Sequence, residues 1–446
     1  MTDFRDALLA EWQRREPLRA PRPLLPLIGD SFDHREIIAA VDVLLSGRLT
    51  MGDRVRQFEQ EFARLVGVPY AVMVNSGSSA NLLAVSAASV PSRSARLAAG
   101  DEVLVPSVCW ATSVWPLLQH GLRPVFVDVD PRTLNVDVND LERRITSRTR
   151  AIFAVHVLGN SAPMAPMVDI AREHGLLLIE DTCESLGSTS GGQWLGSFGN
   201  FGTYSFYYSH HITTGEGGMV VCQTLEDVDL LRSLRSHGWS RDLSNRQEVE
   251  QQFSDVDPRF LFVHSGYNLR PLELQAAIGL CQLARLGAMN ETRHRNRERL
   301  MRALHDHELW DGRFEFPRAA DGTTAAWFGF PCLLSAGFPV PKSAFLAHLT
   351  QSGIENRPII SGNFTRQPAL RAHGLVCDPN AYPGAEAVDQ RGFFIGIHTE
   401  PLPDATIDQL ADILLAPVSA LKGVNVSGPG EGAAPRARRA TSRRRR

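Results

Sequence analysis

The residues with the clearest chemical potential lie in one stretch near the middle of the chain. Residues 203–218 read Thr-Tyr-Ser-Phe-Tyr-Tyr-Ser-His-His-Ile-Thr-Thr-Gly-Glu-Gly-Gly. The imidazole of His210 titrates near neutrality, so it can both take and return a proton. The hydroxyl of Ser205 can reach a phosphate oxygen, and the glycines permit turns closed to other residues. A lone histidine is more often structural, but two adjacent ones in a glycine-rich turn favour proton transfer beside a bound ligand.

Two earlier segments carry groups that suit the same ligand. Asp181 follows a run of four apolar residues, at the predicted carboxyl end of a strand, where ligands of open α/β sheets gather. A carboxylate there can keep a pyridine nitrogen protonated, although helix capping is its everyday use. The segment 75–81, Asn-Ser-Gly-Ser-Ser-Ala-Asn, follows a strand and opens a helix. A helix start favours a phosphate, but this motif alone fits an ordinary capped turn equally well.

Together these segments predict a pyridoxal-phosphate (PLP) pocket without a lysine. Enzymes of this cofactor ordinarily hold it as a Schiff base to lysine, with an acidic residue on the pyridine nitrogen. The chain has only two lysines, Lys342 and Lys422, and it has histidine where the anchoring lysine is expected. We therefore expect a non-covalently held cofactor, in the aldehyde or amine (PMP) form, and His210 as the catalytic base. That substitution favours elimination over amino-group transfer.

Four further residues are candidate ligands, most of them with an ordinary alternative. Trp110, at the start of a predicted helix, could stack on a pyridine ring or pack in the core. Asn268 could donate to a phosphate or serve in a turn. The forked guanidinium of Arg357 suits a carboxylate, or a surface ion pair. Glu184, three residues after Asp181, is a further cofactor-binding candidate.

Alternating strands and helices must position these residues. Short apolar runs separated by helical patterns predict an α/β domain with a mostly parallel sheet. The predicted strands are 70–74, 102–105, 124–128, 151–155, 176–180, 203–207 and 219–222. The predicted helices are 36–45, 55–65, one after Pro106, 139–146, 165–174 and a long one from Pro271 to Asn290 and onward.

The organisation along the chain divides into four parts. We predict an N-terminal arm (1–30), a PLP-binding large domain (31–295), a small C-terminal α/β domain (296–422) and a disordered basic tail (423–446). The arginine-rich tail is better read as a solvated end than as a polyanion-binding element.

Composition excludes several classes of function. The 446 residues are 43% hydrophobic with a formal charge of −3, which gives no bias toward nucleic acid. No apolar run is long enough to span a membrane, and the N-terminus lacks a signal-peptide pattern. The closest pair of cysteines, Cys183 and Cys222, is 39 positions apart, so we expect free thiols, no metal site and a cytoplasmic protein.

With these motifs in order, the chain resembles the DegT/DnrJ/StrS sugar aminotransferase family, fold-type I PLP enzymes that act on nucleotide-linked keto sugars. The likeness runs from about Pro26 to Ile413 and implies an aspartate-aminotransferase-like large domain, with a mixed, mostly parallel sheet, and a smaller C-terminal α/β domain. The motifs that carry it are Gly52 with Phe58-Glu59, 75–79, Glu180-Asp181, Ser205-Phe206, 215–218 and 266–273.

His210 lies six positions before Glu216, which is where this family has its Schiff-base lysine. Histidine there resembles a small branch, 3-dehydratases that remove the C3 hydroxyl of 4-keto-6-deoxy sugars. One kind in this branch carries a [2Fe–2S] cluster and has a Cys-x-Cys pair after an Arg-Asp dipeptide. Here Arg241-Asp242 is followed by Leu-Ser-Asn-Arg, without cysteine. The chain looks like the other kind, which acts on GDP-4-keto-6-deoxymannose and uses glutamate.

The resemblance implies a homodimer with shared active sites that takes a nucleotide-4-keto-6-deoxyhexose and L-glutamate, with glutamate regenerating PMP. Which nucleotide and which hexose stereoisomer it uses stay open, with GDP favoured and TDP realistic. The implied roles are phosphate binding by Gly77, Ser78, Ser205 and Asn268 (the last from the other subunit), stacking by Trp110, pyridine binding by Asp181, substrate contacts across the dimer by His237 and Arg241, and glutamate binding by Arg357.

Two alternatives stay open from the sequence. An iron–sulfur 3-dehydrase with a reductase partner is disfavoured by the missing cysteines, because a single Cys183 cannot hold a cluster that takes four ligands. A non-catalytic regulator on this fold would be consistent with loss of the lysine alone. Retention of Asp181, Ser205 and a titratable His210 argues against the regulator.

Overall fold

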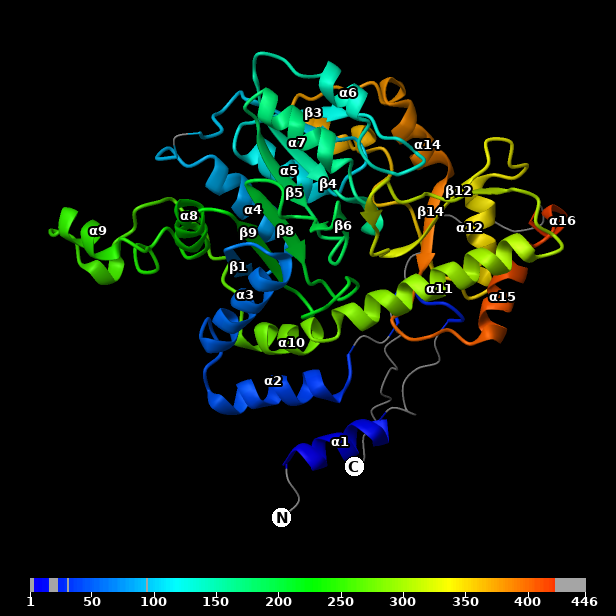
Figure 1. Cartoon of the computed structure of the whole chain (residues 1–446), viewed down its shortest axis with the longest axis horizontal. Helices are drawn as coiled ribbons and strands as arrows, with labels where there is room; N and C mark the ends of the chain where they lie inside the picture. The colour runs from blue at the N-terminus through cyan, green and yellow to red at the C-terminus, as the bar shows by residue number, and fades with distance from the viewer. Residues whose placement is uncertain (1–3, 16–22, 30–31, 94, 422–446) are drawn as a thin grey trace, which may run out of the picture.

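The computed structural model describes residues 4–15, 23–29, 32–93 and 95–421 (Figure 1). The predicted basic tail lies outside these residues, as do the first three positions of the predicted arm and its segment 16–22.

A seven-stranded sheet forms the centre of the large domain, in the order β1-β9-β8-β5-β4-β2-β3. Only β9 runs against its neighbours, so the sheet is mixed and mostly parallel, and the predicted fold class is confirmed. Each predicted strand is present, with bounds shifted by at most two residues. The strands are β1 (Tyr70–Val74), β2 (Glu102–Pro106), β3 (Arg123–Val127), β4 (Thr149–Val155), β5 (Leu177–Asp181), β8 (Phe201–Ser205) and β9 (Gly218–Cys222).

Helices cover both faces of this sheet because the strands are apolar on both sides. Val72 and Val74 of β1 join one core cluster, whereas Ala71 and Met73 join another, as expected when successive side chains point to opposite faces. The helices of this domain are α2 (His34–Ser46), α3 (Asp53–Val66), α4 (Gly77–Ala88), α5 (Ala111–Gln119), α6 (Val138–Arg143), α7 (Met164–Glu173), α8 (Leu225–Arg235), α9 (Arg246–Gln252) and α10 (Glu273–Leu283).

The long helix predicted from Pro271 onward is wrong in one respect, because it is two helices. α10 ends at Leu283, and α11 (Leu286–Asp306) begins after a break. Arg285, at the break, pairs with Asp33 at 3.0 Å and with the buried carboxylate of Glu36. The break therefore places the side chain of Arg285 against the start of α2. The predicted division at residues 295/296 falls inside α11 and stays a prediction.

A second, four-stranded antiparallel sheet lies in the C-terminal part, in the order β10-β12-β14-β13 (Figure 1). Its strands are β10 (Phe314–Glu315), β12 (Gly329–Leu334), β13 (Asn356–Arg357) and β14 (Gly392–Gly396). The remaining helices are α1 (Phe4–Arg15), α12 (Lys342–Gln351), α13 (Pro368–Ala372), α14 (Pro383–Arg391), α15 (Asp404–Leu414) and α16 (Val418–Leu421), and a small sheet joins β6 (Thr189–Ser190), β7 (Gln193–Trp194) and β11 (Thr323–Thr324).

The segment 23–29, which we call the strap, packs on this C-terminal part. The backbone of Leu25 exchanges hydrogen bonds with Gly353 (3.0 Å) and Glu355 (2.9 Å). A side-chain carboxylate oxygen of Glu355 accepts the N–H of Leu27 at 2.9 Å, and His398 Nε2 donates to the carbonyl of Pro26 at 2.9 Å. The strap is thereby held at the junction of the two parts.

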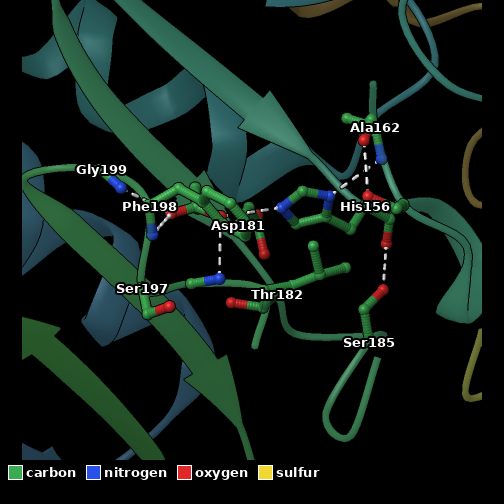
Figure 2. A network of polar contacts seen from close by, with 12 residues as sticks. His156, Ala162, Asp181, Thr182, Ser185, Ser197, Phe198 and Gly199 are labelled. Atoms are coloured by element: carbon green, nitrogen blue, oxygen red, sulfur yellow. Dashed lines mark hydrogen bonds and ion pairs between the residues drawn. The ribbon is translucent and has the colours of Figure 1, made fainter. Parts of the chain in front are cut away.

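A buried carboxylate, that of Glu180, ties the end of β5 to the loop that leads into β8. Figure 2 shows its partners His156, Phe198 and Gly199. Glu180, which is fully buried, accepts the backbone N–H groups of Gly196, Phe198 and Gly199, each at 2.8 Å. It also accepts from His156 Nε2 at 3.3 Å, because Nδ1 of that ring accepts the N–H of Ala162. Glu180 thereby fixes the strand end from which Asp181 projects.

Glu180→Gln should lower the free energy of unfolding by about 2 kcal/mol, because an amide NH2 replaces one oxygen and leaves buried N–H donors unpaired. Urea denaturation of the cofactor-free protein measures this change. Glu173→Gln, on the exposed end of α7, is the control and should change the unfolding free energy by less than about 0.5 kcal/mol. Equal unfolding midpoints for Glu180→Gln and the parent would contradict this account of the loop.

Candidate active site

A cavity of about 550 Å3 lies where β5 and β8 end and α4 begins. This is the edge at which parallel strands of an α/β sheet present their ligands. Of the residues singled out from the sequence, those that line it are Gly77, Ser78, Trp110, Asp181, Glu184, Ser205, His210 and Arg357.

The start of α4 forms a tight cradle against β8. The hydroxyl of Ser76 caps the helix by accepting the N–H of Ser79 at 3.1 Å. A Cβ at Gly77 would lie 2.4 Å from Cβ of Ser205, so only glycine fits there. The first backbone N–H groups of a helix have no partner within it, and this close approach brings them beside the Ser205 hydroxyl. The arrangement suits a phosphate group.

Asp181 is held rigidly by two side chains that the sequence did not single out. Its Oδ2 accepts from Asn81 Nδ2 and from Ser113 Oγ, both at 2.8 Å. Oδ1 accepts the N–H of Cys183 at 3.2 Å, and the carboxylate is 5% exposed. Asn81 belongs to the segment 75–81 one turn after Gly77, so its position, but not its partner, was visible in the sequence.

The indole of Trp110 is 56% exposed although it lines the cavity, which excludes core packing as its role. An aromatic ring beside a fixed carboxylate and a phosphate cradle fits a protonated pyridine ring. The residues present therefore fit the expected cofactor.

His210 lines the cavity and its neighbour His211 does not. His210 Nδ1 lies 3.3 Å from the carbonyl oxygen of Ser205, which can only accept, so this nitrogen carries the hydrogen and Nε2 has a free lone pair. Burial lowers the pKa of His210 to about 4; the Ser205 carbonyl and Asp181 oppose this effect and Arg293 adds to it. The ring is therefore neutral near pH 7, as a general base must be.

His211 has a structural role. Its Nε2 donates to the carbonyl of Ala326 at 2.7 Å, and burial lowers its pKa well below the ordinary value. The structure thus separates the two adjacent histidines by the direction in which each ring points.

Glu184 is a further residue of the cavity whose pKa is shifted. Burial raises the pKa of Glu184 to about 7, with a hydrogen bond from Leu158 N–H opposing and the charge of Asp181 adding to the effect. A carboxyl group that keeps its proton near neutrality can donate a hydrogen bond into the cavity.

Three predicted residues do not line this cavity. His237, Arg241 and Asn268 lie together beyond it, where Ser236 and Asn268 form a β-bridge. The guanidinium of Arg241 stacks over Trp239 at 4.2 Å, and Asn268 Oδ1 accepts from Arg270 Nε at 2.9 Å. Their roles across a subunit interface stay predictions.

Several cavity residues were not singled out as site residues from the sequence, although Ser76, Tyr207, Ser209 and Glu216 lie within the segments 75–81 and 203–218. These are Leu27, Ile28, Ser76, Thr112, Val155, His156, Cys183, Tyr207, Ser209, Glu216, Phe328, Pro358, Ile360 and Phe394.

No three or more histidine, cysteine or acidic side chains among the described residues gather in a way that could hold a metal ion. All six cysteines are free thiols. No helix in the described ranges is long and apolar enough to cross a membrane.

Comparison with known proteins gives one family. The model of the DegT/DnrJ/EryC1/StrS aminotransferase family matches residues 30–414. A GDP-4-keto-6-deoxy-D-mannose 3-dehydratase of Escherichia coli O55:H7 (strain CB9615 / EPEC) is 39% identical over 391 residues, which cover 87% of this chain and 99% of that protein.

A dTDP-4-dehydro-2,6-dideoxy-D-glucose 3-dehydratase of Saccharopolyspora spinosa is 36% identical over 403 residues, or 86% of each chain. A crystal structure of GDP-4-keto-6-deoxymannose-3-dehydratase with a trapped PLP-glutamate geminal diamine superposes with a TM-score of 0.81 at 37% identity. It covers 87% of this chain and 100% of its own.

Glu184→Gln should become more stable relative to the parent as pH rises. The folded state raises the pKa of Glu184 from 4.5 to about 7, so it binds this proton more tightly than the unfolded chain does. That contribution to stability is fully present below pH 4.5 and is lost as pH rises through 7. Glutamine has no such proton to lose.

Thermal unfolding of the cofactor-free protein at pH 5 and pH 8.5 tests this. The difference in Tm, variant minus parent, should increase by a few degrees between the two pH values. The exposed Glu173→Gln should show a constant difference. A pH-independent difference for Glu184→Gln as well would show that Glu184 is not buried in its acid form.

Proposed function

Because the chain belongs to the DegT/DnrJ/EryC1/StrS aminotransferase family, we propose that it is a PLP/PMP-dependent 3-dehydratase. It removes the C3 hydroxyl of a nucleotide-linked 4-keto-6-deoxyhexose, and glutamate regenerates the amine form of the cofactor. The observation that carries this proposal is a neutral His210 facing the cavity, in the family's lysine position, in the same cavity as Gly77, Asp181 and Ser205.

The bound cofactor supplies an electron sink through its protonated pyridine ring. Asp181, oriented by Asn81 and Ser113, keeps the proton on the pyridine nitrogen. The N–H groups at the start of α4 and the hydroxyl of Ser205 hold the phosphate. With the cofactor bound, Nε2 of His210 would take a proton from the cofactor carbon that bears the amine nitrogen. Nδ1–H, bonded to the Ser205 carbonyl, keeps the ring in place.

Among the residues that the structure describes, no lysine lines this cavity. Lys342 donates its ammonium hydrogens to the backbone carbonyls of Asp389 and Gly392 and lines a different pocket. Histidine cannot form the covalent anchor, which leaves the amine free to condense with the C4 ketone. This supports elimination over net amino-group transfer.

Arg357 is placed to receive the carboxylate of glutamate. Its side chain lines the cavity and is exposed, and its NH1 nitrogen donates to the carbonyl of Asn356 at 2.8 Å. Its guanidinium is exposed at the cavity, where its fork can bind a ligand carboxylate.

The enzyme acts as a homodimer in the cytoplasm. A partner subunit supplies Asn268 to the phosphate, and His237 and Arg241 to the sugar nucleotide. Asn268, His237 and Arg241 lie outside the cavity of their own subunit, which supports a shared active site. The exposed side chains of Phe260 (61%) and Phe262 (49%), on the same segment as Asn268, support it as well. All six cysteines are free thiols, which supports a location in the cytoplasm.

The nucleotide is GDP or dTDP, the two that the names of the similar proteins contain. Steady-state assays of GDP-, dTDP- and CDP-4-keto-6-deoxyhexoses with glutamate identify it. Release of 2-oxoglutarate and a 3-deoxy-4-keto sugar supports the proposal. A 4-amino sugar that retains its C3 hydroxyl would show an aminotransferase instead.

His210→Asn should lower kcat for dehydration at least 100-fold, because general-base catalysis contributes about 10²–10⁴-fold. Cofactor affinity, measured by fluorescence titration, should stay within about threefold of the parent. Tyr208→Phe, two residues away and exposed, is the control and should retain kcat. A His210→Lys variant that dehydrates the sugar at the parental rate would show that His210 is not the base.

Arg357→Met should raise the KM for glutamate at least tenfold, because a charge-assisted pair with a carboxylate is lost. Arg357→Lys should be intermediate, since an ammonium group cannot bind both carboxylate oxygens in one plane. The control is Arg371→Met, on the exposed surface of α13. The amine-forming half-reaction, followed by absorbance, measures each value, and an unchanged KM would remove Arg357 from the site.

A further inference from the structure

The cavity is built from two chemically different sets of side chains. The large domain supplies most of the polar groups, among them Asp181, Ser205 and His210. The strap and the C-terminal part supply Arg357 and a set of apolar side chains that we call the apolar wall. It consists of Leu27, Ile28, Phe328, Ile360 and Phe394.

Four residues of the apolar wall are linked through one core cluster. The rings of Phe328 and Phe394 are 6.0 Å apart, and Leu27, Phe328 and Ile360 all pack against the same core cluster as Phe394. A Cβ at Gly396, on the same strand as Phe394, would lie 2.3 Å from the carbonyl of Pro26. The strap therefore lies directly on β14 and presents its apolar residues beside those of the strand.

Ile360 is held in an uncommon backbone conformation. Its φ is +49°, in the left-handed region that β-branched residues strongly avoid. The next residue, Ser361, donates its hydroxyl to the carbonyl of Cys109 at 2.7 Å, which fixes the turn to the large domain. Strain retained at a ligand-lining residue indicates that the contact it makes has a function.

The reacting atom of the sugar must lie close to both sets. Proton transfer to His210 Nε2 requires the amine-bearing carbon of the cofactor within about 3–4 Å of that atom, and the C4 of the sugar is joined to that carbon through the amine nitrogen. The ring of Phe328 is 5.4 Å from the ring of His210, edge to face. The apolar wall thus begins immediately beside the base.

In a 4-keto-6-deoxyhexose, the two ring neighbours of C4 differ in polarity. C3 carries the hydroxyl that leaves, and C5 carries the methyl group that makes the sugar 6-deoxy. These substituents point away from C4 in opposite directions along the ring. A cavity with a polar set and an apolar set can therefore accept the sugar in one orientation only.

Resting on the proposed function, we propose that the apolar wall is a methyl pocket that binds C6 and determines specificity for 6-deoxy sugars. Phe328, Ile360 and the strap residues Leu27 and Ile28 contact the methyl, which turns the C3 hydroxyl toward the polar set. A 6-hydroxyl in this pocket loses its hydrogen bonds to water without replacement. Discrimination against an added hydroxyl in an apolar pocket is on the order of 10–100-fold.

Binding of unreactive sugar nucleotides tests the methyl pocket without catalysis. GDP-D-rhamnose and GDP-D-mannose differ only in the C6 hydroxyl, and neither has a C4 ketone. If the enzyme selects dTDP, dTDP-6-deoxyglucose and dTDP-glucose are the equivalent pair. Calorimetry with the PMP-loaded enzyme should give a Kd for the 6-deoxy compound at least about tenfold lower.

Ile360→Ser should reduce this Kd ratio below about three, whereas Ile360→Val, which keeps an apolar side chain, should retain most of it. Ile28→Ser tests the strap independently, in case serine at position 360 disturbs the turn. Val376→Ser is the control, because Val376 is 86% exposed and away from the cavity. It should leave the ratio unchanged.

Different measurements would contradict the methyl pocket and the proposed reaction. A parental Kd ratio near one, absent binding of both compounds, or a full ratio in folded Ile360→Ser and Ile28→Ser would overturn the methyl pocket, even if dehydration is intact. A parental Kd ratio of at least about ten that falls below about three in Ile360→Ser and Ile28→Ser would support the methyl pocket. If no keto sugar is then dehydrated, only the reaction is overturned.

Discussion

The site depends on one buried carboxylate whose position is set by the sheet. Asp181 is the last residue of β5, and Asn81 and Ser113 fix its orientation from two different helices. Because β5 and β8 are parallel neighbours, their carboxyl ends meet at one edge, which brings Asp181 beside Ser205 and the histidine turn. Glu180, one residue earlier, points to the other side and anchors the loop between the two strands. Glu180 thus has a structural role and Asp181 a role in the cavity, because successive side chains of a strand point to opposite faces.

Burial then sets the protonation states in the cavity. It disfavours charge, so it lowers the pKa of His210 and raises that of Glu184. At neutral pH the site therefore combines an uncharged base with a carboxyl group that retains its proton for much of its population. The buried oxygens of Asp181 are satisfied by hydrogen bonds from Asn81, Ser113 and Cys183. The same low-polarity surroundings that tune these groups continue into the apolar wall.

The cavity needs contributions from distant parts of the chain. The strap reaches it only because backbone hydrogen bonds with Gly353 and Glu355 hold Leu25 against the C-terminal part. Phe328 reaches it because its N–H bonds to the carbonyl of Leu158, whose own N–H bonds to Glu184. One chain of hydrogen bonds thereby joins Phe328 of the C-terminal part to Glu184 of the large domain.

The amino-acid sequence by itself determined the fold class, the order of strands and helices, and the segments that bear the chemistry. Apolar runs and turn residues are local signals, and the spacing of motifs can be read from the sequence without three-dimensional information. The spacing to Glu216 also selected His210 over His211. Only the tertiary structure decided that Asn81 and Ser113 hold Asp181, and that α10 and α11 are separate helices. It also decided that Leu27 and Ile360 share one wall. These features depend on side-chain direction and on contacts between residues far apart in the chain, and no local pattern encodes either.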